Sequence, residues 1–255
     1  ATSLDLQGWA SVDNRSGATF DDAKIKLVAG TVNRAPQPRP YAPDYAREMS
    51  MKAAGVAMAE RGFFEYHLYE VPLRATLSNN EVKQLGLLHA TGVKSAKRYA
   101  YDATRDNDNV LVTIQFENAQ ASGLGMPLPE GVARVFKRDR DGSLELAGED
   151  RIKHTPKNER VRLSVGNAFD IGVERKQTDF RQVTPRITEQ SFEIILRNHK
   201  EEAVDIVVSE HAGGDWELVK QSHPSVKKDA TTFEFTVRCA PEKPVTVTYT
   251  LRTRS

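Results

Sequence analysis

The sequence has one cysteine, Cys239, in 255 residues. A lone thiol cannot form an internal disulfide, and it excludes zinc or iron–sulfur sites built from several cysteines. Long apolar runs are missing as well, because no stretch approaches the ~18 residues that span a bilayer. Lys and Arg total 36 against 35 for Asp and Glu, and the net charge of +1 excludes a strongly basic or acidic binding tail. We expect no transmembrane segment and no nucleic-acid partner.

The common catalytic motifs are also missing. The sequence contains no G-x-S-x-G elbow, no H-E-x-x-H, no Walker-type glycine loop and no G-x-G-x-x-G after a strand. Its six histidines are dispersed, and none stands two or four residues from another, the spacings that place two imidazoles on one face of a strand or helix. We therefore assign no catalytic residue, no cofactor and no metal ligand.

One stretch, Asp102–Asn109, is dense in oxygen ligands and reads D-A-T-R-D-N-D-N. A calcium loop needs ligands at alternating positions and a glycine at the sixth, and this stretch has no glycine. Asp and Asn also suit turns, because their side chains accept hydrogen bonds from their own backbone. We interpret the stretch as a turn and leave open whether it binds a cation.

Period-two alternation of apolar and polar residues dominates the rest of the chain. It is clearest in Val110–Glu117, Phe233–Arg238 and Val245–Arg252. Successive side chains of a strand point to opposite faces, so each run has one core face and one solvent face. This pattern predicts an all-β protein built of antiparallel sheets in a β-sandwich architecture. Asp141-Gly142, between two such runs, predicts a hairpin turn.

Proline and composition suggest the domain organisation. We predict an N-terminal β domain over 1–186 and a C-terminal immunoglobulin-like sandwich over 187–255, because six short strands fit into the last seventy residues. Residues 35–62, rich in Pro, Ala and Met, predict an exposed insertion that is partly helical or mobile. The chain starts in a strand pattern without a signal peptide, so we expect a longer parent protein.

We also predict whether three further side chains are buried. Cys239 follows Phe233, Phe235 and Val237 on the core face, which favours a small buried residue over a nucleophile. Trp9 and Trp216 are interpreted as core anchors, with a sugar-stacking platform as the alternative.

The densest polar stretch is Glu174–Phe180, which reads E-R-K-Q-T-D-F. One interpretation is a solvated strand of mixed charge held by cross-strand ion pairs. The other is a recognition surface with donors and acceptors at strand spacing. On the second interpretation the candidate binding residues are Arg175, Lys176, Gln177 and Asp179.

Several segments together resemble the bacterial DUF4139 family. They read L-Q-G-W-A-S-V-D-N-R-S-G, D-A-K-I-K-L-V-A-G-T-V-N-R, F-E-Y-H-L-Y-E-V, N-E-V-K-Q-L, G-N-A-F-D and E-R-K-Q-T-D-F, with G-D-W-E-L and T-F-E-F-T-V near the end. The resemblance implies an extracytoplasmic protein of the bacterial envelope, in a family that includes mucoidy-inhibitor-like members. The family has no established activity, so the resemblance supplies no catalytic residues.

Three functions remain open on the sequence. The leading hypothesis is a non-catalytic β-sandwich module that binds another protein or a surface polymer of the envelope. The alternative is a carbohydrate-active or other hydrolase whose carboxylates converge from separate strands. A third is a structural spacer within a longer chain.

Overall fold

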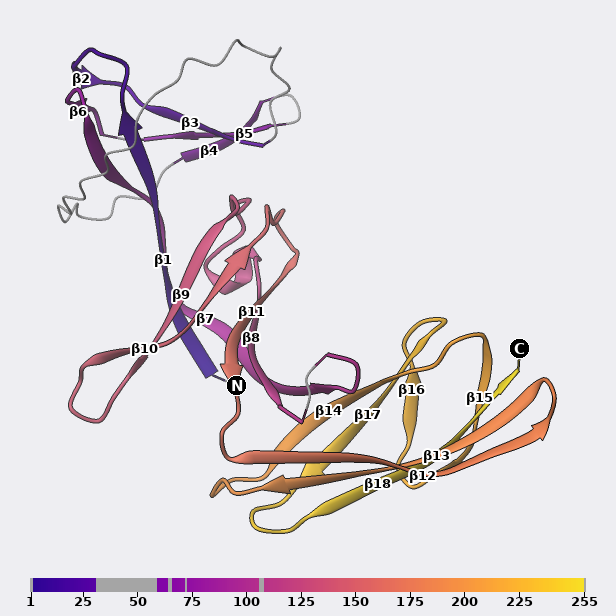
Figure 1. The fold of residues 1–255 in the computed structure, drawn as a ribbon. Helices are drawn as coiled ribbons and strands as arrows, with labels where there is room; N and C mark the ends of the chain where they lie inside the picture. Colours follow the sequence, from indigo (N-terminus) through magenta and orange to yellow (C-terminus); the bar gives the residue numbers. More distant parts are fainter. Residues whose placement is uncertain (1, 31–58, 64–65, 72, 106–107, 255) are drawn as a thin grey trace. The chain divides into compact units, whose positions relative to one another are not determined.

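A computed structural model describes residues 2–30, 59–63, 66–71, 73–105 and 108–254. These residues form strands β1 to β18 in several mainly antiparallel sheets, together with one turn of 3-10 helix, η1 (Gln120–Ser122) (Figure 1). The prediction of an all-β, sandwich-like fold is confirmed. No helix in the described part of the chain has the length and apolar character needed to cross a membrane.

The chain divides into two compact units, each built from separate stretches of sequence. The first unit comprises Ala1–Ser95, Phe116–Val132 and Arg151–Val161, and the second comprises Ala96–Gln115, Ala133–Asp150 and Arg162–Ser255. The long strand β7 (Glu81–Asp102) begins in the first unit and ends in the second.

In the first unit, β1 (Thr2–Asn14) pairs antiparallel with β7 along most of its length, with irregularities between Leu4 and Leu6 and between Gly8 and Trp9. Two small sheets complete this part of the chain, in the orders β3-β5-β4 and β2-β6. Their strands are β2 (Phe20–Ala23), β3 (Lys26–Ala29), β4 (Ala59–Phe63), β5 (Tyr66–Glu70) and β6 (Ala75–Leu77).

The first unit contains a buried hydrophobic cluster. Its buried residues come from β5, β7 and the connections beside β3 and β5, and are Ile25, Tyr69, Val71, Leu85 and Leu87. The Tyr69 hydroxyl donates a hydrogen bond to the Pro127 carbonyl at 2.7 Å, which satisfies the one polar atom of this buried ring.

Buried asparagines end strands in both units. Asn14 donates from Nδ2 to the carbonyls of Ala18, Leu77 and Ser78, and Asn198 donates to those of Glu202 and Cys239. Each amide therefore donates to a carbonyl of its own turn and to a carbonyl of a segment distant in the sequence. This shared role explains why both strands end in Asn.

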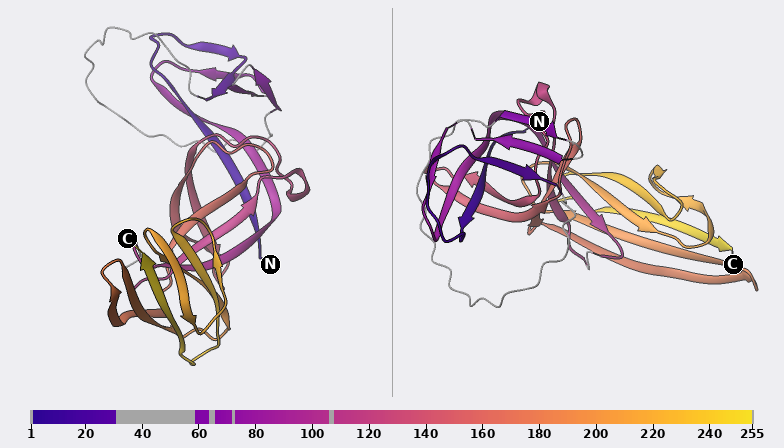
Figure 2. Two further views of the ribbon diagram at one scale, coloured as in Figure 1. Left: turned by 90° about the vertical axis from the view of Figure 1, so that its right-hand side faces the viewer. Right: turned by 90° about the horizontal axis from the view of Figure 1, so that it is seen from above.

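The second unit contains two sheets that face each other (Figures 1 and 2). One has the order β12-β13-β18-β15, and the other includes β14-β17-β16 with the end of β7. The last four residues of β7, Tyr99–Asp102, pair with β14 in parallel, and the other pairs are antiparallel. The bounds are β12 (Ile171–Thr184), β13 (Ile187–Asn198), β14 (Val204–His211), β15 (Asp215–Gln221), β16 (Ser225–Lys227), β17 (Thr232–Cys239) and β18 (Val245–Arg254).

The core of the second unit lies between these two sheets. Its buried members alternate along β13, β14, β17 and β18, and include Ile194, Val208, Phe235 and Val247. Ring contacts tie the sheets together: the Phe233 ring lies edge-on to that of Tyr249, with centroids 5.4 Å apart. Four further strands, β8 (Leu111–Glu117), β9 (Gly131–Arg138), β10 (Leu144–Ile152) and β11 (Arg160–Asn167), complete the chain.

The predicted Asp141-Gly142 turn is confirmed, and it joins β9 to β10. Gly142 has a φ of 92°, a backbone conformation that glycine adopts without steric cost. Gly148 has a different role, because a Cβ placed there would lie 2.1 Å from the Val165 carbonyl oxygen of β11. The chain can approach β11 this closely only because residue 148 has no side chain.

The compact units do not coincide with the predicted domains 1–186 and 187–255. Val183–Arg186, where we expected a boundary, closes the hairpin between β12 and β13, and both strands belong to the second unit. The pairing of β7 with β14 joins residues that are far apart in the sequence, such as Tyr99 and Ile206, and local composition does not show such a pairing. The immunoglobulin-like character of the C-terminal part stays a prediction.

The predicted insertion at 35–62 lies mostly outside the described residues. Residues 35–58 are not described, and residues 59–62 belong to β4, which pairs antiparallel with β5.

Candidate functional site

The predicted binding stretch lies on β12, an edge strand of the four-stranded sheet. Its pairing with β13 shifts between Gln177 and Asp179, so Thr178 is an extra residue, a β-bulge. Lys176 is paired with Glu193 and Asp179 with Ser191, while Gln177 is paired with the core residue Phe192. Because paired residues share a face, the bulge brings Lys176 and Asp179 to the same outer face of the sheet.

Arg175 lies on the other face and points into the sandwich. Its Nε and Nη2 donate to the two carboxylate oxygens of Glu210 on β14, at 2.8 and 3.0 Å. Nη2 also donates to the Tyr249 hydroxyl at 3.2 Å, and the guanidinium lies 4.1 Å from the centre of the Phe192 ring. The side chain of Arg175 is 26% exposed and that of Glu210 is 1% exposed. This bidentate pair therefore links the two sheets.

The electrostatics follow from this enclosure. Burial alone lowers the pKa of Arg175, but the hydrogen bonds and charge of Glu210 outweigh it and raise the pKa overall. Burial, and then the Glu210 charge, raises the pKa of Tyr249. The guanidinium stays charged and the phenol stays neutral, so the network is a fixed structural element. Arg175 is thus placed for packing, not on an open recognition surface.

Sequence reasoning missed Glu210, although a signal was present. In β14, Val204, Ile206 and Val208 alternate toward the core, and Glu210 is the next residue in that series. In β12, Ile171 and Val173 form the corresponding series before Arg175. A charged residue at each of two core-facing positions predicts a buried ion pair, because a single buried charge is costly.

The remaining predicted residues are exposed. Lys176 forms an ion pair with Glu174 at 2.6 Å, and Glu174 also pairs with Arg197 on β13 at 2.8 Å. Gln177 contacts the backbone carbonyl of Asp179 at 3.5 Å. The structure therefore brings Lys176 and Asp179 together on one face and separates both from Arg175.

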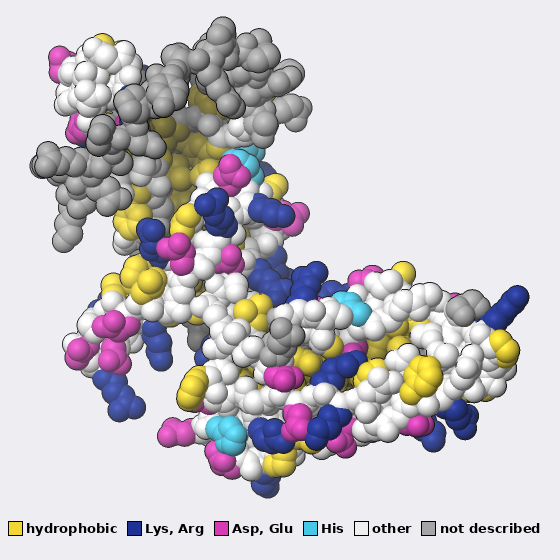
Figure 3. All heavy atoms as spheres, in the orientation of Figure 1, with side chains coloured by type: hydrophobic (Ala, Val, Ile, Leu, Met, Phe, Trp, Pro, Cys, Tyr) yellow, Lys and Arg dark blue, Asp and Glu magenta, His cyan; other side chains and the backbone are white. Residues whose placement is uncertain are grey.

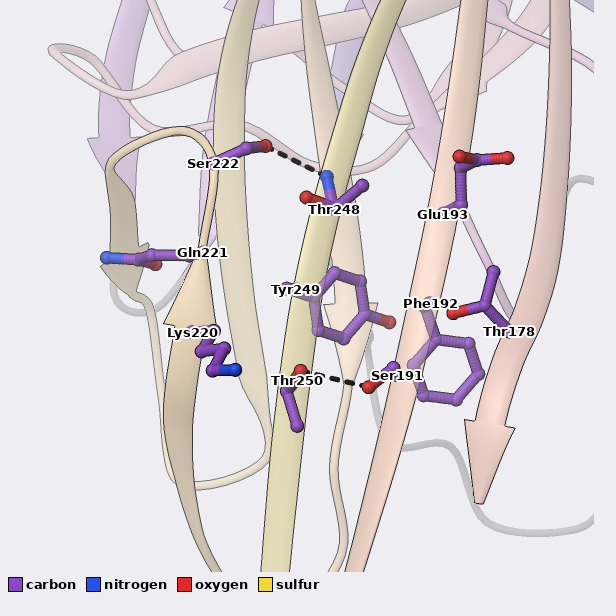
Figure 4. A pocket seen from close by; sticks show the side chains of 10 residues that line it. All are labelled: Thr178, Ser191, Phe192, Glu193, Lys220, Gln221, Ser222, Thr248, Tyr249 and Thr250. Carbon is purple, nitrogen blue, oxygen red and sulfur yellow. Dashed lines mark hydrogen bonds between the residues drawn. The ribbon is translucent and has the colours of Figure 1, made fainter. Parts of the chain in front are cut away.

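A shallow depression of about 290 Å³ opens beside these residues, on the outer face of the sheet (Figure 4). It is lined mainly by hydroxyl, amide and charged side chains, from β12, β13, β18 and the end of β15: Thr178, Ser191, Phe192, Glu193, Lys220, Gln221, Ser222, Thr248, Tyr249 and Thr250. The Ser191 and Thr250 hydroxyls are hydrogen-bonded at 2.9 Å between β13 and β18 (Figure 4). Lys176 and Asp179 are the strand neighbours of Glu193 and Ser191, and so they flank it.

A ladder of alternating charges crosses the same face nearer the end of β18. Arg252 donates to Glu189 at 2.6 Å and to Glu217 at 2.9 Å, and Arg181 donates to Glu189 at 3.1 Å. Arg252, and to a lesser degree Arg181, lower the pKa of Glu189 against the opposing effect of burial. On the side of the second unit visible in Figure 3, basic and acidic side chains lie next to one another.

A second cluster joins Asp102, His211 and Thr232. His211 Nε2 lies 3.1 Å from Asp102 Oδ1, and Nδ1 lies 3.3 Å from the Thr232 hydroxyl. The order of acid, imidazole and hydroxyl is that of a nucleophilic triad. Thr232 is only 8% exposed and is the strand partner of His211, so this cluster holds β17 to β14 and to the end of β7. Asp102 also accepts hydrogen bonds from the backbone N–H and hydroxyl of Thr104, as predicted for a turn.

Of the other predictions made from the sequence, those for Cys239 and Trp216 are confirmed and that for Trp9 is wrong. Cys239 is buried as predicted, and burial, followed by the charge of Asp205, raises the pKa of its thiol to about 11. Trp216 packs against the core and donates from its indole to the Ala230 carbonyl. Trp9 was predicted to be a core anchor and is instead 55% exposed. The described residues contain no group of three His, Cys, Asp or Glu that could hold a metal ion, while residues 106–107 of the Asp102–Asn109 stretch are not described.

Comparison of the chain with protein-family models, with curated proteins and with solved structures found no match.

Proposed function

We propose that the second unit is a non-catalytic binding module that recognises its partner with the outer face of the sheet β12-β13-β18-β15. The surface consists of the depression together with Lys176 and Asp179 at its β12 border. The partner is a surface polymer or a protein of the bacterial cell envelope, in keeping with the resemblance to the DUF4139 family and its extracytoplasmic members.

The composition of the depression carries this proposal. Serine and threonine hydroxyls from three strands, one amide, Glu193 and Lys220 supply both donors and acceptors on a shallow, extended surface. Side chains of this kind suit a chain of hydroxyl groups, and they favour a polysaccharide over a protein with a large apolar contact. Their positions are fixed by the sheet, which reduces the entropy cost of binding.

Hydrolysis is the less favoured alternative at this site. Glycoside hydrolysis requires two carboxyl groups on opposite sides of the bond that breaks. Among the residues that line the depression, Glu193 is the one carboxylate. The residues that line the depression therefore supply one carboxylate, and the second that hydrolysis requires would have to come from Asp179 at its β12 border.

The test is binding of the purified chain to a purified bacterial exopolysaccharide, with immobilised envelope proteins as a second arm. We expect retention on the polysaccharide, weakened about tenfold or more by Lys220→Ala with Thr248→Ala, since residues at the centre of a contact often contribute about 1–3 kcal/mol. Lys243→Ala, in an exposed turn outside the depression, is the matched control and leaves binding unchanged.

Three results are distinguishable. Retention by envelope proteins alone, lost in the same double variant, assigns the surface to a protein partner. Equal retention of wild type and double variant overturns the site. Failure of both arms supports the structural-spacer interpretation.

A further inference from the structure

Strand β12 lies at the edge of its sheet and has 14 residues, more than the other edge strands of the two facing sheets in the second unit. Among the described strands its pairing partner is β13, so its other edge presents backbone N–H and C=O groups to solvent. From Lys176 onward the side chains are exposed, and the Phe180 side chain is 59% exposed. An edge with these properties is a template for a further strand.

The charges on the outer face of this strand form an alternating series. Glu174, Lys176, Asp179 and Arg181 read minus, plus, minus, plus, and their strand partners on β13 place all four on the outer face. They share that face only because of the bulge at Thr178, without which Asp179 and Arg181 would face inward. Read in the opposite direction, the series is plus, minus, plus, minus.

From this we infer that two copies of this chain associate edge to edge through β12, antiparallel and about a two-fold axis between Gln177 and Thr178. In this register Lys176 lies opposite Asp179 of the second copy, and Glu174 lies opposite Arg181 of the second copy. A two-fold interface requires a surface that is complementary to itself, and this series meets that requirement at all four positions.

The inner face of the strand supports the same register. Phe180 comes to lie opposite Arg175 of the second copy, whose guanidinium already lies over the Phe192 ring. Two inward-facing side chains thus meet on the same face, and part of the exposed Phe180 ring is removed from water. A shift of one residue in either direction pairs inward-facing with outward-facing residues, for example Arg175 with Arg181, and so loses the match between the two copies.

The edge shares Lys176 and Asp179 with the β12 border of the proposed binding surface. The variant that tests that surface, Lys220→Ala with Thr248→Ala, lies on β15 and β18, so failure of one proposal is distinguishable from failure of the other. Exposed ion pairs contribute little individually, so we expect a weak dimer that depends on protein concentration and dissociates at high salt. The two bulges near the axis reduce the number of backbone hydrogen bonds that the strands can form.

Sedimentation velocity over a wide range of protein concentration tests the inference. Wild type is expected to sediment as a monomer and dimer in equilibrium. Lys176→Asp and Asp179→Lys each place like charges across the axis and should raise the dissociation constant about tenfold or more. The two changes combined restore opposite charges and should return the constant to near the wild-type value. Lys243→Asp, in an exposed turn, is the control for charge change alone.

The combined variant also controls for effects within one copy. Lys176→Asp places a carboxylate beside Glu174 in both the single and the combined variant, so relief of that repulsion does not account for a recovery. A monomeric wild type at every concentration overturns the inference. The inference is also overturned if both single variants dimerise as strongly as wild type. It is likewise overturned if the combined variant has a dissociation constant no lower than those of the single variants.

Discussion

Arg175 and Arg181 lie six residues apart on β12, and both donate to a glutamate, but on opposite faces of the sheet. Arg175 meets Glu210 between two sheets, where the carboxylate is 1% exposed. Arg181 meets Glu189 on the outer face, within a ladder that continues through Arg252 to Glu217. If one partner of the pair between the sheets is removed, the charge of the other stays buried and poorly solvated. If one partner of the pair on the outer face is removed, water solvates the charge that remains. The face, set by strand parity and one bulge, decides the energetic role of each residue.

The largest effect is expected for Glu210→Gln. It leaves the Arg175 guanidinium in the interior without a compensating charge, and we expect a loss of about 3 kcal/mol in the free energy of unfolding, the lower end of values for buried pairs because Arg175 is partly exposed. Urea unfolding followed by fluorescence measures this. A loss within experimental error would contradict the structural role of the pair.

Replacing both partners sharpens the comparison. Arg175→Met combined with Glu210→Leu removes the two charges together and keeps similar side-chain volumes. We expect a free energy of unfolding within about 1 kcal/mol of wild type, or higher, because neither charge is left buried alone. If the double variant is as unstable as Glu210→Gln, the loss comes from packing and not from charge.

The outer ladder should respond more weakly and with a salt dependence. Glu189→Gln removes the central carboxylate between Arg181 and Arg252 on an open face. We expect a shift of the urea midpoint clearly smaller than that of Glu210→Gln, and a shift that shrinks as salt is added. The test is to measure the urea midpoints of Glu189→Gln and Glu210→Gln at low and at high salt. A midpoint shift for Glu189→Gln that does not change with salt would contradict an exposed ion pair.

The smallest expected effect is the contribution of Glu174 to stability at acid pH. Hydrogen bonds from Lys176, and then from Arg197, hold the pKa of Glu174 at about 2, below its ordinary value of 4.5. A carboxylate with a depressed pKa stabilises the fold fully above pH 4.5, and the contribution is lost as pH falls toward 2. In Glu174→Gln, the free energy of unfolding should therefore fall less steeply between pH 4.5 and about 2 than it does in wild type. Parallel profiles for wild type and variant between these pH values would refute the ion pairs.

The sequence predicted much of the fold because alternation is a local property. The series ending at Cys239, the hairpin at Asp141-Gly142 and the turn at Asp102 all follow from residues close in the chain. The division into units was not accessible in this way. It depends on the pairing of β7 with β14, between residues far apart in sequence.

The site illustrates the same limit at the scale of one strand. The polar stretch on β12 was found, but the outward position of Asp179, on the same face as Lys176, depends on the bulge at Thr178. Period-two reasoning does not say which residue of a strand is the extra one. The inward position of Arg175 was readable from Ile171 and Val173, since it precedes the bulge.

The most direct test of this account compares Arg175→Ala with Lys176→Ala, two adjacent basic residues on opposite faces of one strand. Urea unfolding of both variants under one set of conditions is the measurement. We predict that Arg175→Ala lowers the free energy of unfolding by about 3 kcal/mol, because Glu210 is then left buried without its partner. Lys176→Ala should leave the unfolding midpoint close to that of wild type. Equal losses in the two variants, or the larger loss in Lys176→Ala, would contradict the assignment of Arg175 to the interior and Lys176 to the surface.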